Sequence, residues 1–267
     1  MKKYILFLAI ITIVVSCKTK EKESVKEEEI KIQEVQAEPN IFVRKTTFPS
    51  KDSLLITADV YEVNGLKPTI LLCHQAGFSR GEYKDTALKL NKLGYSCMAI
   101  DQRSGKIAND VKNETVQRAL DKGLPTGYMD AKQDIETAID FMYNENGNQP
   151  VIIVGSSYSA SLVLLIGKDN PKVSAVASFS PGEYLKGVNL SEKVKDYAKP
   201  VFVTSSKKEI TQVNELEIVM TDGFLFHFKP KTEGIHGSRA LWESTEGNDK
   251  YWEVFEEFLE MVKKEVR

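Results

Sequence analysis

A serine, a carboxylic acid and a histidine occur in this chain in a pattern suited to acyl transfer. Because a serine hydroxyl is a weak nucleophile, an imidazole must accept its proton and a carboxylate must orient that imidazole. The candidates are Ser157 as nucleophile, Glu209 as acid and His236 as base. These residue types predict a hydrolase that forms a covalent intermediate on the serine.

The residues around Ser157 have the pattern of a tight turn between a strand and a helix. An apolar run, a glycine, two serines and a leucine-rich stretch follow one another there. The residue at the apex of such a turn is strained, so the positions two residues before and after it must be small. Gly155 and Ser159 meet this condition for Ser157, whereas Ser156 has Val154 two residues before it. The alternative is an ordinary serine-rich helix N-cap.

The chain has three histidines, which makes the choice of a base short. His236 lies between Gly234 and Gly237, so we expect it on a flexible loop that presents the ring over a sheet edge. His227 lies within an apolar run and is expected in a strand. His74 precedes the nucleophile and is not expected to be catalytic.

The acid should follow a strand that lies between the serine and the histidine. Glu209 is the first carboxylate after the apolar run 201–204, and a carboxylate at the carboxyl end of that strand can reach the imidazole. The alternative is that Glu209 starts a helix, where it interacts favourably with the helix dipole. Glu183 is the second candidate acid. Otherwise it lines the substrate site with Tyr184.

Short apolar runs alternate with helical patterns from residue 41 onward. The expected strands are Ile41–Phe48, Leu54–Glu62, Thr69–Cys73, Ser96–Ile100, Val151–Val154, Val173–Ser178, Val201–Thr204 and Gly223–Phe228. The expected helices are Tyr83–Leu93, Tyr128–Asn144, Ser157–Gly167 and Lys250–Val266. Nearly continuous apolar runs are typical of strands buried on both faces of a parallel sheet. The pattern predicts an α/β fold with a doubly wound, mostly parallel sheet of about eight strands.

The order serine, acid, histidine resembles that of the α/β-hydrolase fold. Residues 69–77 are similar to the strand and His-Gly-x-Gly oxyanion loop of that superfamily, with Gln75 in place of a glycine. Residues 94–105 resemble its strand and turn of pattern G-Y-x-V-x-x-x-D-x-R-G-x-G. The resemblance extends from about residue 45 to the end. It is greatest to the small esterase and dienelactone-hydrolase branch, whose name-giving enzyme has a cysteine where Ser157 stands.

The resemblance implies that the backbone N–H groups of Ala76 and Tyr158 form an oxyanion hole, with Gln75 as an alternate donor and a residue of the substrate site. It implies that His74 braces this loop through hydrogen bonds. No cofactor and no metal are expected. The connection between the strand Val173–Ser178 and Pro200 is too short for a large lid domain, which favours carboxylic esters with small or polymer-attached acyl groups. An acyltransferase or amidase with the same triad, and a binding protein without turnover, remain open alternatives.

The amino-terminal segment resembles a bacterial lipoprotein signal. Two lysines, the apolar run Tyr4–Val15 and Ser16-Cys17 follow one another, and the residues before the cysteine resemble a lipobox. This implies a signal peptide at 1–16, a lipid on Cys17, a charged flexible tether at 17–40 and a hydrolase domain at 41–267. An ordinary secretory signal or an uncleaved anchor is the alternative. Lys18 in place of an aspartate favours the outer membrane of a bacterial envelope, facing the periplasm or the cell surface.

The composition excludes several other classes of protein. The chain has 267 residues, 36 Lys and Arg against 38 Asp and Glu, and three cysteines. This balance gives no basic surface for nucleic acid, and the cysteine spacing fits neither a disulfide scaffold nor a zinc site. Cys73 and Cys97 are expected to be buried and unpaired, because they lie at opposite ends of neighbouring strands. The expected partners are an ester substrate and, through Cys17, a membrane. The oligomeric state is left open.

Overall fold

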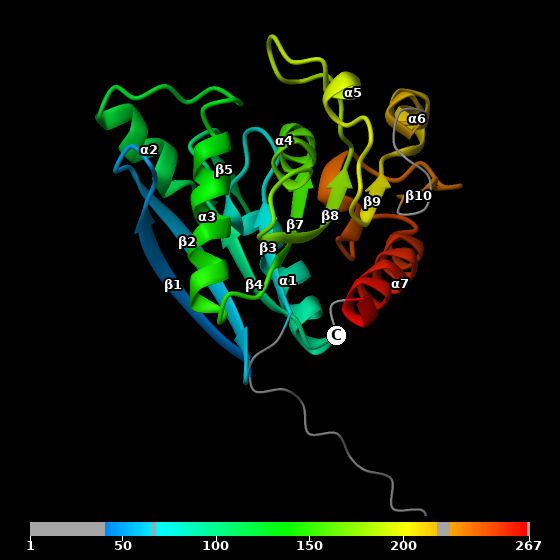
Figure 1. The fold of residues 1–267 in the computed structure, drawn as a ribbon, viewed down its shortest axis with the longest axis horizontal. Coiled ribbons are helices and arrows are strands. Elements are labelled where there is room, and N and C mark those ends of the chain that lie inside the picture. Colours follow the sequence, from blue (N-terminus) through cyan, green and yellow to red (C-terminus); the bar gives the residue numbers. More distant parts are fainter. Residues whose placement is uncertain (1–40, 66–67, 218–224, 266–267) are drawn as a thin grey trace, which may run out of the picture. The chain divides into compact units, whose positions relative to one another are not determined.

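Eight strands form one sheet in the order β1-β2-β4-β3-β7-β8-β9-β10 (Figure 1). The structure, a computed structural model, describes residues 41–65, 68–217 and 225–265. The strands are β1 (Ile41–Pro49), β2 (Leu55–Val63), β3 (Thr69–Cys73), β4 (Ser96–Ile100), β7 (Val151–Ser156), β8 (Val173–Phe179), β9 (Val201–Thr204) and β10 (Leu225–Phe228). β2 runs antiparallel to β1 and β4, and the other pairings are parallel. The predicted α/β-hydrolase architecture is therefore confirmed.

The helices lie on both faces of this sheet (Figure 1). They are α1 (Lys84–Lys92), α2 (Glu114–Asp121), α3 (Lys132–Glu145), α4 (Tyr158–Gly167), α5 (Leu190–Lys193), α6 (Ile210–Glu217) and α7 (Asn248–Glu265). Three short 3-10 helices, η1 (Arg80–Tyr83), η2 (Lys207–Glu209) and η3 (Gly237–Leu241), and a small hairpin of β5 (Ile107–Ala108) and β6 (Val111–Lys112) complete the described elements. No helix of the described residues is long and apolar enough to cross a membrane.

Burial on both faces explains why the central strands are almost wholly apolar. Leu71 and Cys73 of β3 belong to one hydrophobic cluster, which includes α3 and α4. Ile70 and Leu72 of the same strand belong to the other cluster, which includes α1 and α7. Side chains alternate between the two faces of a strand, so both sets of positions must be apolar when helices cover both faces.

The predicted elements differ from the structure mainly in their ends and in the omission of three helices, one of which is the four-residue α5. Helix α3 begins at Lys132, four residues after the predicted start at Tyr128. Helices α2 and α6 were not predicted, because each spans only eight residues and lies in a connection. The predicted starting residue of the last strand, Gly223, lies outside the described residues, as do the signal peptide, Cys17 and the tether.

The two cysteines of the sheet are buried and free, as predicted. Cys97 is opposite Ile70 in the β3–β4 register, and Cys73 is opposite Ile100. Three residues along a strand separate the two cysteines by about 10 Å, too far for a disulfide. Burial also raises the pKa of both thiols, which makes them unreactive.

Candidate active site

Ser157 lies at a strained turn between β7 and α4. Its backbone has φ 60° and ψ −120°, a conformation that residues other than glycine rarely adopt. Its N–H donates to Phe179 O at 2.9 Å, and the residue is 8% exposed. A Cβ at Gly155 would lie 2.4 Å from Ser159 O, so only glycine fits there. The local geometry is that of a nucleophile elbow with Ser157 at its apex.

Ser159, where the usual elbow has a glycine, joins the elbow to the loop after β3. Its hydroxyl donates to His74 O at 2.6 Å and accepts from Gln102 Nε2 at 2.6 Å. The side chain is fully buried. The hydroxyl is therefore accommodated by hydrogen bonds, which a glycine at this position would not form.

His236 contacts Glu209 at the carboxyl edge of the sheet. His236 Nδ1 forms a hydrogen bond with Glu209 Oε1. Glu209 Oε2 accepts from Ser206 N at 3.0 Å, Ser206 Oγ at 2.7 Å and Ser180 Oγ at 2.9 Å. Burial alone would raise the pKa of Glu209, but these bonds to His236 and the serines outweigh it and lower the pKa to about 2. Glu209 is ionised at neutral pH and accepts the Nδ1 proton of the imidazole.

Glu209 also lies in the first turn of a helix, which was the alternative role considered for it from the sequence. Its carboxylate forms a capping box with Ser206 at the start of η2. Ser206-Lys207-Lys208-Glu209 is the S-x-x-E pattern of such a box, so the sequence contained a signal for Ser206 that was not used. The same carboxylate caps the helix with one oxygen and contacts His236 with the other.

The loop that carries His236 is attached to the elbow. Ser238 N donates to Ser156 Oγ at 2.9 Å, and Gly237 N donates to Ser180 Oγ at 2.9 Å. A Cβ at Gly237, whose φ is 75°, would lie 2.4 Å from Ser156 Oγ. Ser156, the other serine of the turn, is thus engaged in holding the histidine loop.

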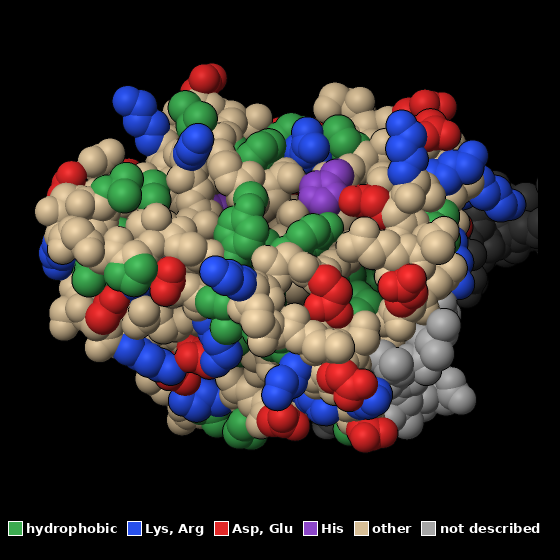
Figure 2. Space-filling view, turned by 90° about the horizontal axis from the view of Figure 1, so that it is seen from above, with side chains coloured by type: hydrophobic (Ala, Val, Ile, Leu, Met, Phe, Trp, Pro, Cys, Tyr) green, Lys and Arg blue, Asp and Glu red, His purple; other side chains and the backbone are tan. Residues whose placement is uncertain are grey.

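Ser157 and His236 are next to, or two residues from, the residues that this bond joins, and the described structure shows no hydrogen bond between their side chains. Catalytic hydrogen bonds often tighten only when substrate binds. Figure 2 views this edge of the sheet and shows a histidine at the surface, with an acidic side chain beside it and hydrophobic side chains nearby. The His236 side chain is 32% exposed on this side, whereas Ser157 is buried.

The loop after β3 approaches the elbow because the two strands are neighbours. Cys73, the last residue of β3, is opposite Gly155 in the register. The Tyr158 N–H lies in the first turn of α4, where N–H groups have no partner within the helix. Ala76 follows β3 by three residues and is half-buried. The two predicted oxyanion donors therefore follow adjacent strand ends.

The predicted substrate-site residues occupy different places. Gln75 is 5% exposed, and its amide donates to Glu82 Oε1 at 3.3 Å, so its side chain supports the loop. The ring of Tyr184 lies edge-on to His236, with centroids 6.5 Å apart. Glu183 Oε2 accepts from Leu190 N at 2.8 Å, at the start of α5. Of the two carboxylates considered as the acid, only Glu209 contacts His236. Contact of these residues with substrate stays a prediction.

Several residues of the site were not singled out in the sequence. Ser180 follows β8 and connects Glu209 to the histidine loop. Glu82, fully buried in η1, accepts from Ser238 Oγ at 2.6 Å and from Gln75 N at 2.8 Å. Burial raises its pKa, against these hydrogen bonds and that of Ser156. No local pattern marks Ser180 or Glu82, because their partners are distant in sequence.

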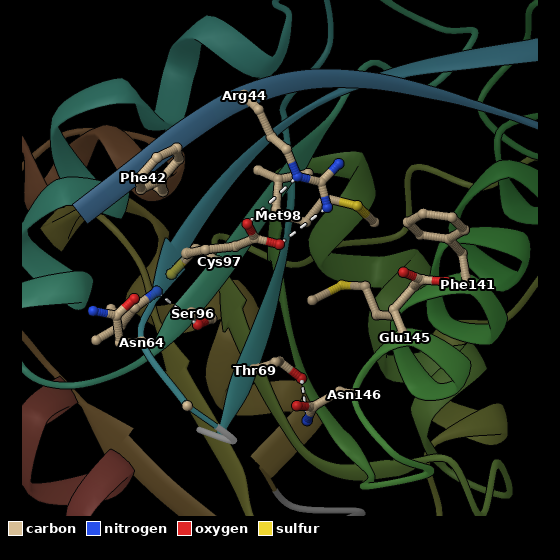
Figure 3. A pocket seen from close by; sticks show the side chains of 15 residues that line it. Phe42, Arg44, Asn64, Thr69, Ser96, Cys97, Met98, Phe141, Glu145 and Asn146 are labelled. Carbon is tan, nitrogen blue, oxygen red and sulfur yellow. Dashed lines mark hydrogen bonds and ion pairs between the residues drawn. The ribbon is translucent and has the colours of Figure 1, made fainter. Parts of the chain in front are cut away.

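A separate groove of about 440 Å³ lies between β1, β2 and α3 (Figure 3). It is lined in part by Arg44, Met98 and Phe141. It also reaches Thr69 and Ser96, the first residues of β3 and β4. It therefore reaches the amino ends of β3 and β4, whereas Ser157 follows the carboxyl end of β7.

The sheet order, the elbow after β7 and the histidine loop define a protein of the α/β-hydrolase class. The model of the serine aminopeptidase S33 family matches residues 65–206, more than half of the chain. The chain belongs to this family and is a hydrolase. No curated protein matches the chain.

Solved structures with the same fold include esterases and dienelactone hydrolases. An esterase of Pyrococcus furiosus is 15% identical with a TM-score of 0.62, and the match covers 83% of this chain and 93% of that one. A dienelactone hydrolase of Anabaena variabilis is 14% identical with a TM-score of 0.62, covering 83% and 98%. A putative dienelactone hydrolase of Klebsiella pneumoniae is 14% identical with a TM-score of 0.61, covering 84% and 98%. At these identities the similarity establishes the fold.

Proposed function

We propose that this protein is a serine hydrolase that cleaves carboxylic esters through an acyl-enzyme on Ser157. The observation that carries the proposal is the His236–Glu209 hydrogen bond beside a strained elbow whose apex is Ser157. The bond from Ser238 N to Ser156 Oγ supports it, because it holds the histidine loop against the residue next to the nucleophile.

Each step of the reaction follows from the role of one group. Ionised Glu209 accepts the Nδ1 proton of His236, which leaves Nε2 free to take a proton from Ser157 Oγ. Ser157 Oγ attacks the acyl carbon, and the N–H groups of Ala76 and Tyr158 stabilise the negative oxygen that develops. His236 then donates the proton to the leaving alcohol. Water repeats the sequence and releases the acid and the free serine.

The shape of the site favours small or polymer-attached acyl groups. The connection from β8 to β9 contains only one helix, the four-residue α5. Tyr128, which begins the segment before α3, stacks on Tyr158 with ring centroids 4.4 Å apart. Tyr128 is 39% exposed, so an aromatic surface borders the elbow without covering it. Long acyl chains would need a larger apolar cover.

A fluorophosphonate probe tests whether Ser157 is an activated nucleophile. We expect the probe to label the wild type, to label Ser156→Ala more slowly because this variant loses the bond from Ser238 N, and not to label Ser157→Ala; ester hydrolysis should show the same order. Labelling of Ser157→Ala with none of Ser156→Ala would move the nucleophile by one residue. A folded wild type without labelling would refute the proposal and favour a binding protein. Transfer of a labelled acyl group to added alcohols or amines, measured with enzyme that has not reacted with the probe, distinguishes acyltransferase activity from hydrolysis.

We further propose that the protein is anchored in a bacterial envelope by a lipid on Cys17. The apolar run before this cysteine supports the proposal, together with the charged segment at 17–40 that would serve as a tether. Three acyl chains on one residue would hold the protein far more firmly than a single chain. Lys18 favours the outer membrane, where periplasmic or cell-surface esters are within reach.

A further inference from the structure

The side-chain amide of Asn113 connects helix α2 to the loop after β3. Its Oδ1 accepts from Val116 N at 2.8 Å and caps the helix. Its Nδ2 donates to Gln102 O at 2.7 Å and lies 3.2 Å from His74 Nε2. Because the capping atom must be the oxygen, the other end of the amide must be the NH2 group. Asn113 therefore donates to His74 Nε2.

This donation to Nε2 and the contact of Nδ1 with Gln75 O together determine which nitrogen of His74 carries the proton. A neutral imidazole has one donor and one acceptor, so Nε2 accepts and Nδ1 donates. His74 Nδ1 lies 2.8 Å from Gln75 O, which is an acceptor only. The ring is fully buried, and burial lowers the pKa of His74 to about 4, against hydrogen bonds with Gln75 and Gln102. The ring is thus neutral at pH 7.

The orientation of Gln75 O in turn sets the direction of the Ala76 N–H. The two groups belong to one planar trans peptide and point in opposite directions. Gln75 O also accepts from Phe78 N at 3.2 Å, and Gln75 N donates to Glu82 at 2.8 Å. With Gln75 O directed at His74, the Ala76 N–H points away from that ring.

The packing leaves the pair no room to rearrange. A Cβ at Gly105 would lie 2.5 Å from Asn113 Nδ2 and 2.6 Å from His74 Cε1. Asn113 is 3% exposed. Gly105 and Asn113 both belong to the connection between β4 and α2, so this connection closes around the ring.

We propose that Asn113 is a positioning residue that, by selecting the Nδ1–H tautomer of His74, directs the Ala76 N–H toward the oxyanion of the reaction. The inference rests on the proposed function, because it assigns a role to that N–H. It makes the N-cap of α2 part of the support of the active site, although α2 does not contribute a catalytic group. Its effect is on the chemical step and not on substrate affinity.

Substitution of Asn113 by serine, with a matched control, tests this role. Serine retains a capping oxygen but is too short to donate to His74 Nε2. Removal of one oxyanion donor lowers kcat by about 10² to 10³, so its misdirection should lower kcat and the fluorophosphonate labelling rate by roughly 10- to 100-fold, with little change in KM. The control is Asn189→Ser, because Asn189 caps α5 through Glu192 N at 3.0 Å. The control should stay within about 3-fold of wild type. Equal rates in the two variants would overturn the proposal.

Two substitutions of His74 distinguish the roles of its two ring nitrogens. In His74→Asn the amide nitrogen takes the place of Nδ1 and can still donate to Gln75 O. In His74→Gln the amide extends toward the place of Nε2. We expect His74→Asn to keep most of the wild-type rate of probe labelling. The labelling rate of His74→Gln should fall by about 10-fold or more, because the oxyanion donor is then misdirected. A His74→Gln variant as active as His74→Asn would contradict the proposal.

Nitrogen NMR of the three histidine rings reports the tautomer of His74 directly and does not depend on enzyme activity. The wild type should show His74 as the neutral Nδ1–H form, and Asn113→Ser should show a mixture of tautomers. Asn189→Ser should keep the wild-type signal. An Nε2–H form in the wild type would overturn the proposal even if the enzyme is active. A wild type that the probe does not label would refute the proposed function, and the tautomer would still decide the role of Asn113 toward His74.

Discussion

Replacement of Glu209 by glutamine should remove most of the activity, because an amide cannot replace the hydrogen bonds of this carboxylate. Glu209 accepts from His236 Nδ1, Ser180 Oγ and both the N–H and the hydroxyl of Ser206. The backbone N–H of Ser206 requires an oxygen, so the amide NH2 would face His236. The imidazole would then carry its proton on Nε2 and be unable to accept one from Ser157. Loss of a triad acid in this way lowers kcat by about 10⁴, and we expect 10² to 10⁴ here.

The same substitution should weaken the fold in a pH-dependent manner. The pKa of Glu209 is about 2, against an ordinary value of 4.5. That difference corresponds to about 3 kcal/mol, and we expect about 1–2 kcal/mol at pH 7 because solvent reaches the partly exposed carboxylate. A lowered pKa stabilises the folded state fully above pH 4.5 and less as the pH falls toward 2. The stability difference between wild type and Glu209→Gln should therefore shrink below pH 4.5.

The assay is ester hydrolysis at pH 7 with urea unfolding at pH 7 and at pH 3.5. Glu233→Gln serves as the control, because Glu233 is 63% exposed and its carboxylate pairs with Lys207 at 3.8 Å. Activity of Glu209→Gln within about 3-fold of wild type would refute the assignment, since a triad acid is worth far more. Normal activity there with loss in Glu183→Gln would move the acid to the earlier loop. A stability difference that does not shrink at pH 3.5 would refute the linkage argument.

Three further predictions concern the elbow and the anchor. Ser157→Gly and Ser157→Ala should both be inactive, but the glycine variant should be more stable by about 1 kcal/mol in thermal unfolding, because φ 60° strains alanine; equal stability would argue against a strained apex. Gly155→Ala should lose about 1–3 kcal/mol and its probe labelling, because the new Cβ would lie 2.4 Å from Ser159 O; unchanged unfolding and labelling would contradict the close approach. Metabolic labelling with an alkynyl fatty acid should mark the wild type and not Cys17→Ser, and equal labelling of both would exclude the lipid anchor.

The strands of the sheet were predictable from the sequence because their signal is local. The segments Thr69–Cys73, Ser96–Ile100 and Val201–Thr204 were predicted with the ends that the structure shows. Burial on both faces leaves a continuous apolar run, which stands out against its polar flanks. Helix α2 was missed because its capping residue, Asn113, lies in a long connection whose apolar pattern spans only two turns.

The sequence by itself determined which residue types were available and in what order. It favoured Glu209 over Glu183 as the acid, because Glu209 is the first carboxylate after the strand 201–204, but it could not show which of the two reaches the imidazole. The choice depends on tertiary structure, which directs Glu209 to His236 and Glu183 to the N–H groups of α5.

The supporting hydrogen bonds depended entirely on the tertiary structure. Ser156 meets Ser238 across 82 positions of the chain, and Asn113 meets His74 across 39. Such partners are selected by strand order and register, which bring the ends of β3, β7 and β8 together. Local periodicity carries no information about them, because it records only which face of an element is buried.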